Sequence, residues 1–307
     1  MERRAFLKRL LAAAALALGL DGLGLQSLLP RMACAAKDSP LVATGTNQDY
    51  GRLVTEVISA LGGMERFVKP GSRVLVKPNM SWDRRPEFGA TTHPLVVKRI
   101  VELCLEAGAR EVTVMDRPCN DERRCYQESG VQPAVEAIGS SRAKVKHVNS
   151  RLFVEKTMPR GVALKRWDFY REALEAEALI IAPPAKQHGS ARLSLGMKNV
   201  MGLVGGRRER LHVGDLHQHI ADLNTVLRAH LTVIDATRLL TANGPSGGNL
   251  QDVRVLNRLA ASADPVAADS YAASLFGLKG GDIGYIQHAY QMGFGEMDLT
   301  KVKVVEV

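Results

Sequence analysis

The sequence predicts an α/β fold: a mostly parallel central sheet with helices on both faces, built as a single elaborated domain. Three observations support this fold. Short apolar runs rich in β-branched residues alternate with stretches in which apolar residues recur at helical spacing. Charged residues make up 24% and hydrophobic residues 46% of the 307 residues, which is ordinary for a globular chain. No internal repeat or low-complexity linker divides the sequence into separate parts.

Six short segments have the composition of strands. Each is apolar and rich in aliphatic residues, and several end at a proline or an aspartate. Because helical patterns separate these runs, we expect neighbouring strands to be parallel and covered on both faces. The candidate strands are Val74–Val76, Glu111–Met115, Lys144–Val148, Ala178–Ala182, Leu231–Asp235 and Val302–Val307.

Three segments have the apolar spacing of helices. In the first, apolar residues recur every three or four positions over residues 96–107, and Gly108 ends the pattern. The second covers Leu216–Leu227 and the third Asp264–Leu275. Residues 184–250 are rich in Gly, Lys and His and poor in strand signal, so a second layer formed by this stretch is the alternative to one domain.

The first 35 residues have the pattern of an export signal. Arg3-Arg4 opens a motif typical of the twin-arginine route, and the apolar run Leu10–Leu20 is too short to span a membrane. Ala33-Cys34-Ala35 offers a cleavage site. We therefore expect residues 1–35 to be a signal peptide and residues 36–307 the folded domain. The twin-arginine machinery would deliver it to the periplasm, whereas an uncleaved signal would anchor the chain to the membrane.

Charge and aromatic content argue against a nucleic-acid binder. The whole chain carries a formal net charge of +9, and residues 1–35 hold five basic and two acidic side chains, so the remainder carries about +6. This excess favours anionic ligands. Aromatic residues are only 5%, and no polybasic run is present. The densest basic clusters, Arg123-Arg124 and Arg207–Arg210, are expected to be solvated faces.

Cysteine usage excludes a disulfide scaffold and an iron–sulfur cluster held within the chain. Four cysteines are spread over 307 residues, and three of them follow residue 35. Cys104 falls on the apolar stripe of the first helix and is expected in the core. Cys119 and Cys125 are six positions apart, and a disulfide between them is left open.

Polar residues that follow the candidate strands mark the candidate site, because ligands of parallel sheets bind at the carboxyl ends of strands. Lys77-Pro78-Asn79 follows one strand and Lys186–His188 follows another, while Asp116 and Asp235 end two more. Lys198-Asn199 comes soon after, among glycines that allow a ligand to approach the backbone. Lysine supplies charge for a carboxylate or phosphate, and histidine transfers protons or binds metals.

We therefore expect one site in which a small anionic ligand meets lysine and histidine side chains. The catalytic residues would be His188, Lys198 and His212, and a metal would be held by His188 and His212 rather than by cysteine. The alternative is a surface loop with solvated lysines. The anion or cofactor would be bound by Lys77, Asn79, Lys186, Asn199, Gly244 and Gly247.

The two glycines of this set belong to Asn243–Gly248, which is either a loop of turn-forming residues or a backbone nest for an anion. The segment is not a Walker A loop, and no G-x-G-x-x-G motif follows a strand, so a dinucleotide site is disfavoured. His93 precedes a helix and either caps it or contacts a ligand there. His217, His219 and Asp222 share a helix and are expected to form an exposed polar face rather than a metal site.

Nine short motifs occur in a fixed order along the chain, from about residue 42 to 278. They are Val76–Asn79, Ala90–Pro94, Lys186–Gly189, Met197–Gly202, Leu211-His212, Ile220–Asn224, Asp235–Thr237, Gly244–Gly248 and Asp264–Asp269. In this order they resemble the domain of unknown function 362 family. The resemblance implies a bacterial or archaeal protein with one α/β domain, sometimes fused to a ferredoxin module, and no settled reaction. The chain has no Cys-x-x-Cys-x-x-Cys run, so that module is not expected.

A second, local resemblance concerns three residues. His188, Lys198 ten positions later and His212 fourteen positions after that are similar to a set found in lactate racemases of the nickel-pincer type. There the lysine anchors the pincer cofactor, and the histidines serve as metal ligand or as acid and base. The resemblance implies that a lysine-linked organometallic cofactor is an alternative to a histidine-held metal.

Two classes of function remain open. The first is an enzyme that acts on a small anionic substrate, in which lysines hold the anion and histidines move protons. The second is a non-enzymatic accessory protein that binds a cofactor or metal and serves a redox partner. Convergence of the lysines and histidines in one pocket would favour the enzyme, whereas an open, shallow groove would favour the accessory protein.

Overall fold

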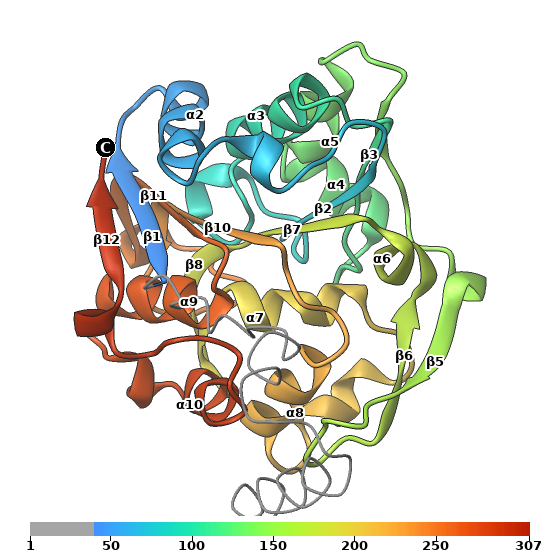
Figure 1. Ribbon diagram of the computed structural model, residues 1–307, viewed down its shortest axis with the longest axis vertical. Coiled ribbons are helices and arrows are strands. Elements are labelled where there is room, and N and C mark those ends of the chain that lie inside the picture. Colours follow the sequence, from blue (N-terminus) through green and yellow to red (C-terminus); the bar gives the residue numbers. More distant parts are fainter. Residues whose placement is uncertain (1–39) are drawn as a thin grey trace, which may run out of the picture. The chain divides into compact units, whose positions relative to one another are not determined.

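A mixed sheet runs through the centre of residues 40–307, which are the part of the chain that this computed structural model describes (Figure 1). The expected signal peptide lies outside these residues. Two strands, β8 (Pro184–His188) and β9 (Arg192–Ser194), branch from the main path at β10. In spatial order that path is β12 (Lys303–Glu306), β1 (Leu41–Thr46), β11 (Val253–Ser262), β10 (Leu231–Leu240), β7 (Ala178–Ala182), β2 (Arg73–Pro78), β3 (Glu111–Val114) and β4 (Ala143–Val145).

Most strand pairs of this sheet are parallel, which confirms the predicted mostly parallel sheet. The parallel pairs are β12–β1, β7–β10, β8–β10, β2–β7, β2–β3 and β3–β4, whereas β1–β11, β10–β11 and β8–β9 are antiparallel. The central strand β7 is Ala-Leu-Ile-Ile-Ala, and all of it is buried. A strand covered on both faces needs such an unbroken apolar run.

Helices cover both faces of the sheet, as the sequence predicts (Figure 1). On β2, Leu75 packs into one hydrophobic core while Val74 and Val76 pack into the other, because successive side chains of a strand point to opposite faces. The core that contains Val74 and Val76 lies under four helices: α2 (Tyr50–Ala60), α3 (Pro94–Glu106), α4 (Glu122–Glu128) and α5 (Val131–Glu136). The core that contains Leu75 lies under five: α6 (Arg171–Glu175), α7 (Gly196–Asn199), α8 (Leu216–Leu223), α9 (Pro265–Ser274) and α10 (Gly284–Gln291).

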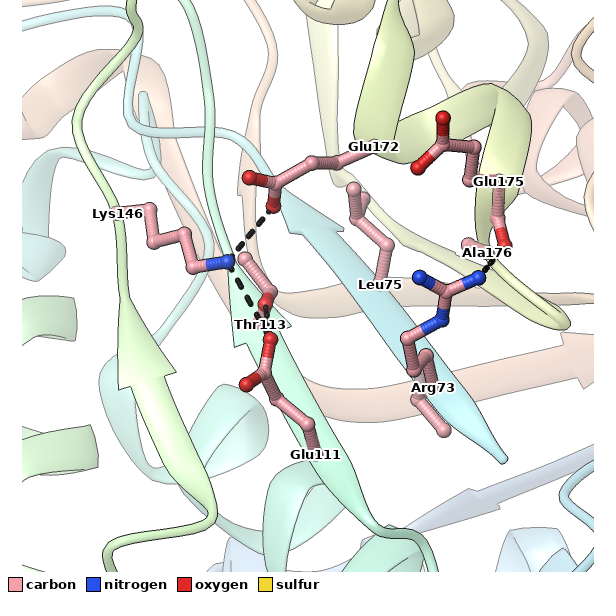
Figure 2. A pocket seen from close by; sticks show the side chains of 9 residues that line it. Arg73, Leu75, Glu111, Thr113, Lys146, Glu172, Glu175 and Ala176 are labelled. Atoms are coloured by element: carbon pink, nitrogen blue, oxygen red, sulfur yellow. Dashed lines mark hydrogen bonds and ion pairs between the residues drawn. The ribbon is translucent and has the colours of Figure 1, made fainter. Parts of the chain in front are cut away.

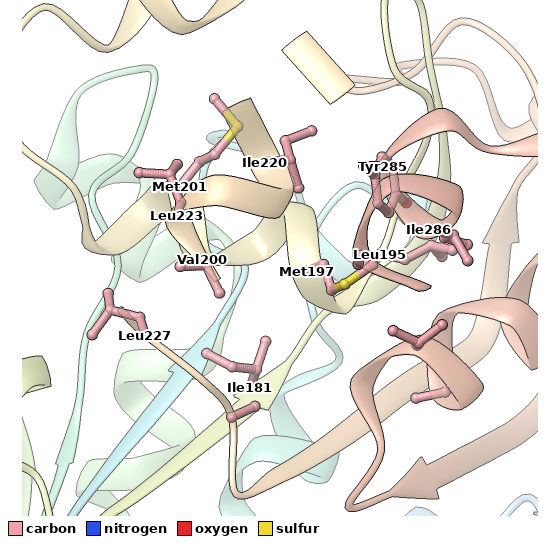
Figure 3. Close-up of a cluster of buried hydrophobic side chains, with 14 of the residues drawn as sticks. Ile181, Leu195, Met197, Val200, Met201, Ile220, Leu223, Leu227, Tyr285 and Ile286 are labelled. Carbon is pink, nitrogen blue, oxygen red and sulfur yellow. The ribbon is translucent and has the colours of Figure 1, made fainter. Parts of the chain in front are cut away.

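The single turn α7 is held in place by apolar packing (Figure 3). Met197 within α7 and Val200 just after it are buried. Their neighbours in the cluster come from β7, α8 and α10, and they include Ile181, Ile220, Leu223, Tyr285 and Ile286. Since Lys198 and Asn199 lie between Met197 and Val200, this packing fixes the backbone that presents both polar side chains.

Ser39–Val307 form one unit, which confirms the single α/β domain. All six predicted strands are present, although the segment predicted at Lys144–Val148 is the shorter and earlier β4. Residues 184–250 contain more strands than their weak strand signal indicates, since only Leu231–Asp235 was predicted there. β8, β9 and the second half of β10 all lie there, because pairing with neighbouring strands outweighs the weak strand propensity of Pro-Ala-Lys-Gln-His.

The sequence analysis also missed the strands β1 and β11, which lie near one end of the sheet, and the helix α2. A separate two-stranded hairpin is formed by β5 (Phe153–Thr157) and β6 (Arg166–Tyr170). The helices expected over residues 96–107, 216–227 and 264–275 are α3, α8 and α9. Within residues 40–307, no helix has both the length and the apolar character needed to cross a membrane.

Candidate functional site

A cavity of about 300 Å³ lies where β2 and β7 end, and β8 forms part of its wall. It holds seven of the nine residues that the sequence analysis assigned to the anion and catalytic groups. Gly244 and Gly247 are not among the lining residues, although Pro245 between them is. The lining residues are Lys77, Asn79, Ser81, Trp82, Cys119, Lys186, His188, Ser194, Lys198, Asn199, Met201, Gly202, Arg208, His212 and Pro245.

At the floor of the cavity, Lys77 forms a buried ion pair with Asp116. The two side chains are 1% and 0% exposed, and Lys77 Nζ lies 3.0 Å from Asp116 Oδ1. Asp116 follows β3 and also accepts a hydrogen bond of 2.7 Å from the Met80 amide. Burial lowers the pKa of Lys77, and the neighbouring Asp116 carboxylate opposes that shift. Each member of the pair therefore depends on the other.

Two asparagine side chains connect the lysines. Asn199 Oδ1 accepts from Lys77 Nζ at 2.5 Å and from Asn79 Nδ2 at 2.9 Å. Asn79 Oδ1 in turn accepts from Lys186 Nζ at 3.1 Å. Asn199 Nδ2 also donates to the Lys77 carbonyl oxygen at 3.2 Å. This chain of hydrogen bonds joins the carboxyl end of β2 to α7 and β8, and it explains why asparagine is needed at both positions.

Gly202 allows the backbone after α7 to pass close to the ion pair. A Cβ atom at this position would overlap Asp116 Oδ1 and the Cε atom of Lys77. Because both of those side chains are buried, neither can move away freely. The residue is glycine for lack of space and not because of an unusual backbone angle.

Lys186 is buried without an ionic partner. Its Nζ donates to Asn79 Oδ1 and, at 2.5 Å, to the Ala90 carbonyl oxygen. No carboxylate of residues 40–307 lies within ion-pair distance of it. Burial lowers the pKa of Lys186 to about 7, and the positive charges of Lys198 and Lys77 add to the shift. At neutral pH this side chain is therefore divided between the ammonium and amine forms.

Lys198 has even fewer partners. Its side chain is 9% exposed, and its only hydrogen-bond contact among the described residues is the Met201 sulfur, 3.7 Å from Nζ. Burial lowers the pKa of Lys198 to about 8. A thioether is a weak acceptor, so the ammonium form is poorly stabilised here.

Asp269 fixes the turn that carries Lys198. It is fully buried in α9 and accepts from the Gly196 and Met197 amides at 2.8 and 2.9 Å, which are the first amides of α7. Burial raises the pKa of Asp269 to about 7, although these two hydrogen bonds oppose the shift. The sequence analysis noticed Asp269 only as part of a motif, because its role depends on a contact across the fold.

His188 is held in one tautomer. Its Nδ1 atom accepts hydrogen bonds from the Ser190 and Ala191 amides, each at 3.2 Å. The proton of the neutral ring must then be on Nε2. Burial and the neighbouring Lys198 lower the pKa of His188 to about 3, so the ring is neutral near pH 7. In this state His188 can donate a hydrogen bond to an anion through Nε2 but cannot accept a proton there.

The His212 ring lies parallel to that of His188, with 6.2 Å between the ring centroids. Burial and Lys198 lower the pKa of His212 as well. In the part of the chain that is described, no three His, Cys, Asp or Glu side chains are placed to hold a metal ion. Coordination through Nε2 of His188 would also put a proton on Nδ1, facing two amide donors. The predicted metal held by His188 and His212 therefore lacks a fitting donor set.

Arg208 is a site residue that the sequence analysis assigned to a solvated face. That assignment is wrong for Arg208, which lines the cavity and donates to the Arg117 and Pro118 carbonyl oxygens at 2.6 and 2.9 Å. It also lies 3.2 Å from Cys119 Sγ. Cys119 and Cys125 are both free, so no disulfide joins them, and Cys104 is buried in the core as predicted.

Three other predicted groups have structural roles. The Gly244 amide donates to Gln187 Oε1 at 2.7 Å, so it is not available to an anion. His93 caps α3, since its Nδ1 accepts from the Leu95 amide. Asp222 is fully buried, which overturns its expected exposed face. It accepts hydrogen bonds from the three consecutive amides of residues 162–164 and so closes the loop between β5 and β6.

A second cavity, of about 210 Å³, is lined from β2, β3 and α6 (Figure 2). Lys146 Nζ lies between Glu111 and Glu172, at 3.3 and 2.9 Å from their carboxylate oxygens. Arg73 donates to the Glu175 carbonyl oxygen. These charges are partnered within the protein, in contrast to Lys186 and Lys198, so we place the functional site in the first cavity.

A solved structure of low sequence identity has a similar fold. The lactate racemase apoprotein from Thermoanaerobacterium thermosaccharolyticum superposes with a TM-score of 0.50 at 12% identity, covering 76% of this chain and 56% of that one. A Thermotoga maritima protein solved by structural genomics gives a TM-score of 0.42 at 12% identity, covering 74% and 59%. This chain spans little more than half of either structure.

Sequence comparison gives a closer relationship. A thylakoid-associated protein of a Synechocystis strain is 27% identical over 220 residues, which cover 69% of this chain and 65% of that protein. The family described as Domain of unknown function (DUF362) matches residues 74–274, a stretch that contains all seven lysine, asparagine and histidine residues of the cavity. The chain therefore belongs to the DUF362 family.

Proposed function

We propose that this cavity binds a small anionic ligand bearing a carboxylate or phosphate, and that its lysines and histidines act on that ligand. The observation that carries the proposal is the burial of Lys186 and Lys198 without a carboxylate partner among the described residues. Lys77 shares the cavity, but Asp116 already neutralises it. A bound anion would satisfy the two remaining cations and relieve their mutual repulsion.

Each group has a role that follows from its contacts. Lys186 and Lys198 would bind the anion, with Arg208 at the wall adding positive charge. His188 would donate a hydrogen bond through Nε2, and His212 would exchange protons with the ligand. This convergence on one cavity supports an enzyme. The alternative, an accessory protein that binds a cofactor or metal for a redox partner, predicts binding without turnover.

Calorimetric titration with lactate and with inorganic phosphate tests the anion site. Lactate is the first probe because it is a small carboxylate and is named for the racemase of similar fold. We expect Lys198→Met to abolish binding and leave thermal stability intact, since methionine is of similar length and would lie beside Met201. Lys156→Met is the control, because Lys156 is exposed and lies outside the cavity. Unchanged affinity in Lys198→Met would contradict the proposal.

A lysine-linked organometallic cofactor is the second candidate. The support is that Lys198 lines the cavity with no acceptor other than the Met201 sulfur among the described residues, and that the fold resembles that of the racemase. In this chain Lys198 would anchor such a group, and His212, which also lines the cavity, would supply an imidazole. When bound, it would supply a Lewis-acidic metal centre. Intact-mass and elemental analysis of protein from its own host test this. A polypeptide without added mass or metal would contradict it.

We also propose that the protein is exported by the twin-arginine route to the periplasm. The support is the Arg3-Arg4 motif, which lies outside the described residues. Replacing both arginines by lysine should leave the full-length precursor in the cytoplasm, as cell fractionation would show. Arg31→Lys, outside the motif, is the matched control. Export of the double variant at the wild-type level would refute the proposal.

A further inference from the structure

The three lysines of the cavity differ in the acceptors that surround them. Lys77 Nζ contacts a carboxylate and an amide oxygen. Lys186 Nζ contacts an amide oxygen and a carbonyl oxygen. Lys198 Nζ has only the Met201 sulfur among the described residues. An ammonium group needs three acceptors, whereas an amine presents a lone pair that can react.

The surroundings of Lys198 favour that amine. The side chain is nine-tenths buried, which disfavours its charged form, and the charge of Arg208 adds to this effect, while Cys119 at the cavity wall opposes it. The amine is not sealed off, since Lys198 lines the cavity together with Lys186 and His188. A desolvated lysine with cationic neighbours is a pattern of nucleophilic lysines that attack carbonyl groups.

We propose that Lys198 forms an imine with a small 2-oxo acid. This inference rests on the proposed anion site and names its substrate class. Lys186, which also lacks a carboxylate partner, would hold the carboxylate of the ligand. Burial lowers the pKa of the free Lys186 side chain, but the negative charge of a bound carboxylate would favour its ammonium form. The adjacent carbonyl carbon would then face Lys198 Nζ. His188 would donate a hydrogen bond from Nε2 to the carbonyl oxygen and stabilise the charge that develops there.

The step is a condensation without change of oxidation state. The lone pair of Lys198 Nζ forms a bond to the carbonyl carbon, and the carbonyl π electrons move to the oxygen, which takes up a proton. The nitrogen loses its protons as the carbon–oxygen bond breaks, and one water molecule leaves. The products are the imine and water, so no oxidant, reductant or metal is needed.

Reductive trapping tests the proposal. Recombinant full-length chain is incubated with pyruvate and cyanoborohydride, and intact mass and peptide mapping are recorded. We expect one reduced pyruvate adduct per chain, located on Lys198, and its loss in Lys198→Met. Lys156→Met is the matched control and should be labelled as the wild type is. Lactate, which has the same charge but no carbonyl, should bind without forming an adduct.

The pH profile separates Lys198 from surface lysines. With the pKa of Lys198 at about 8, its amine fraction and the initial labelling rate should rise roughly tenfold between pH 7 and 9. An ordinary lysine with a pKa near 10.4 would show roughly a hundredfold rise over the same range.

The outcomes distinguish the two proposals. Binding of pyruvate and lactate without any adduct would overturn the imine and leave the anion site intact. An adduct mapped to Lys186 or to surface lysines would also overturn it. Failure of both acids to bind would overturn the anion site itself. A starting mass that already includes a group on Lys198 would overturn the imine in favour of the linked cofactor.

Discussion

Replacing Asp116 by asparagine should be among the most damaging single changes in the cavity. The variant keeps an oxygen that can accept from the Met80 amide, but it turns an amide nitrogen towards Lys77 in place of a carboxylate. At the 3.0 Å separation of the pair and an effective dielectric constant of about 20, Coulomb's law gives roughly 5–6 kcal/mol of lost attraction.

The loss of stability has an upper limit, because Lys77 can become neutral by losing its proton. Deprotonating an ordinary lysine at pH 7 costs roughly 4–5 kcal/mol. Measured losses on breaking a buried pair are about 3–5 kcal/mol, in agreement with that limit. We therefore expect Asp116→Asn to lower the free energy of unfolding by about 3–5 kcal/mol at pH 7. Urea denaturation followed by circular dichroism measures it.

Two further variants sharpen the test. Lys77→Met in the Asp116→Asn background removes the buried cation that has lost its carboxylate partner, so the double variant should be more stable than Asp116→Asn alone. Glu56→Gln removes the exposed Arg52–Glu56 pair, whose atoms are closer, at 2.7 Å, and it should leave the denaturation midpoint unchanged. Equally small losses of unfolding free energy in Asp116→Asn and Glu56→Gln would show that burial does not make the Lys77–Asp116 pair more stabilising than an exposed pair.

The remaining predictions concern pH and space. In the folded protein the pKa values of Lys186 and Lys198 are about 7 and 8, whereas an unfolded lysine has a pKa near 10.4. Between pH 7 and about pH 10 the unfolded chain therefore binds more protons than the folded protein does. The free energy of unfolding of the ligand-free protein should therefore rise by about 2–4 kcal/mol from pH 7 to 9, and a double replacement by methionine should flatten the rise. Gly202→Ala should lower the free energy of unfolding by about 1–3 kcal/mol. Gly189→Ala is the control and should leave it unchanged, because a Cβ atom at Gly189 would meet no atom within 4 Å. Equal denaturation midpoints for the two variants would contradict the overlap at Gly202.

The part of the site that was predictable from the sequence is the part next to strands with a strong apolar signal. Lys77 follows Val74–Val76 and Lys186 follows Ala178–Ala182, and parallel strands bring their carboxyl ends to one edge. That rule places both lysines in the same cavity although they are more than a hundred positions apart. The pairing of β2 with β7, on which the argument depends, is observed.

Other parts of the site depend on contacts that no local pattern encodes. Arg208 lies in a basic cluster, and only the carbonyl oxygens of the segment after β3 show that it turns inward. Asp222 lies on a helix with polar neighbours, and only the loop of residues 162–164 shows that it is buried. In both cases, a side chain whose sequence neighbours predict exposure to solvent forms hydrogen bonds with backbone groups far away in the sequence.

The chemistry of Lys186 follows from one feature that the sequence analysis did not predict, the strand β8. In a solvated loop, a lysine keeps its ordinary pKa and acts as a cation. As a residue of β8, Lys186 pairs through its backbone with both β9 and β10, and its side chain is turned into the cavity and is 1% exposed. Burial then lowers its pKa to about 7. The residue type therefore predicts affinity for an anion, but strand pairing determines whether the lysine meets that anion as an ammonium ion or as an amine.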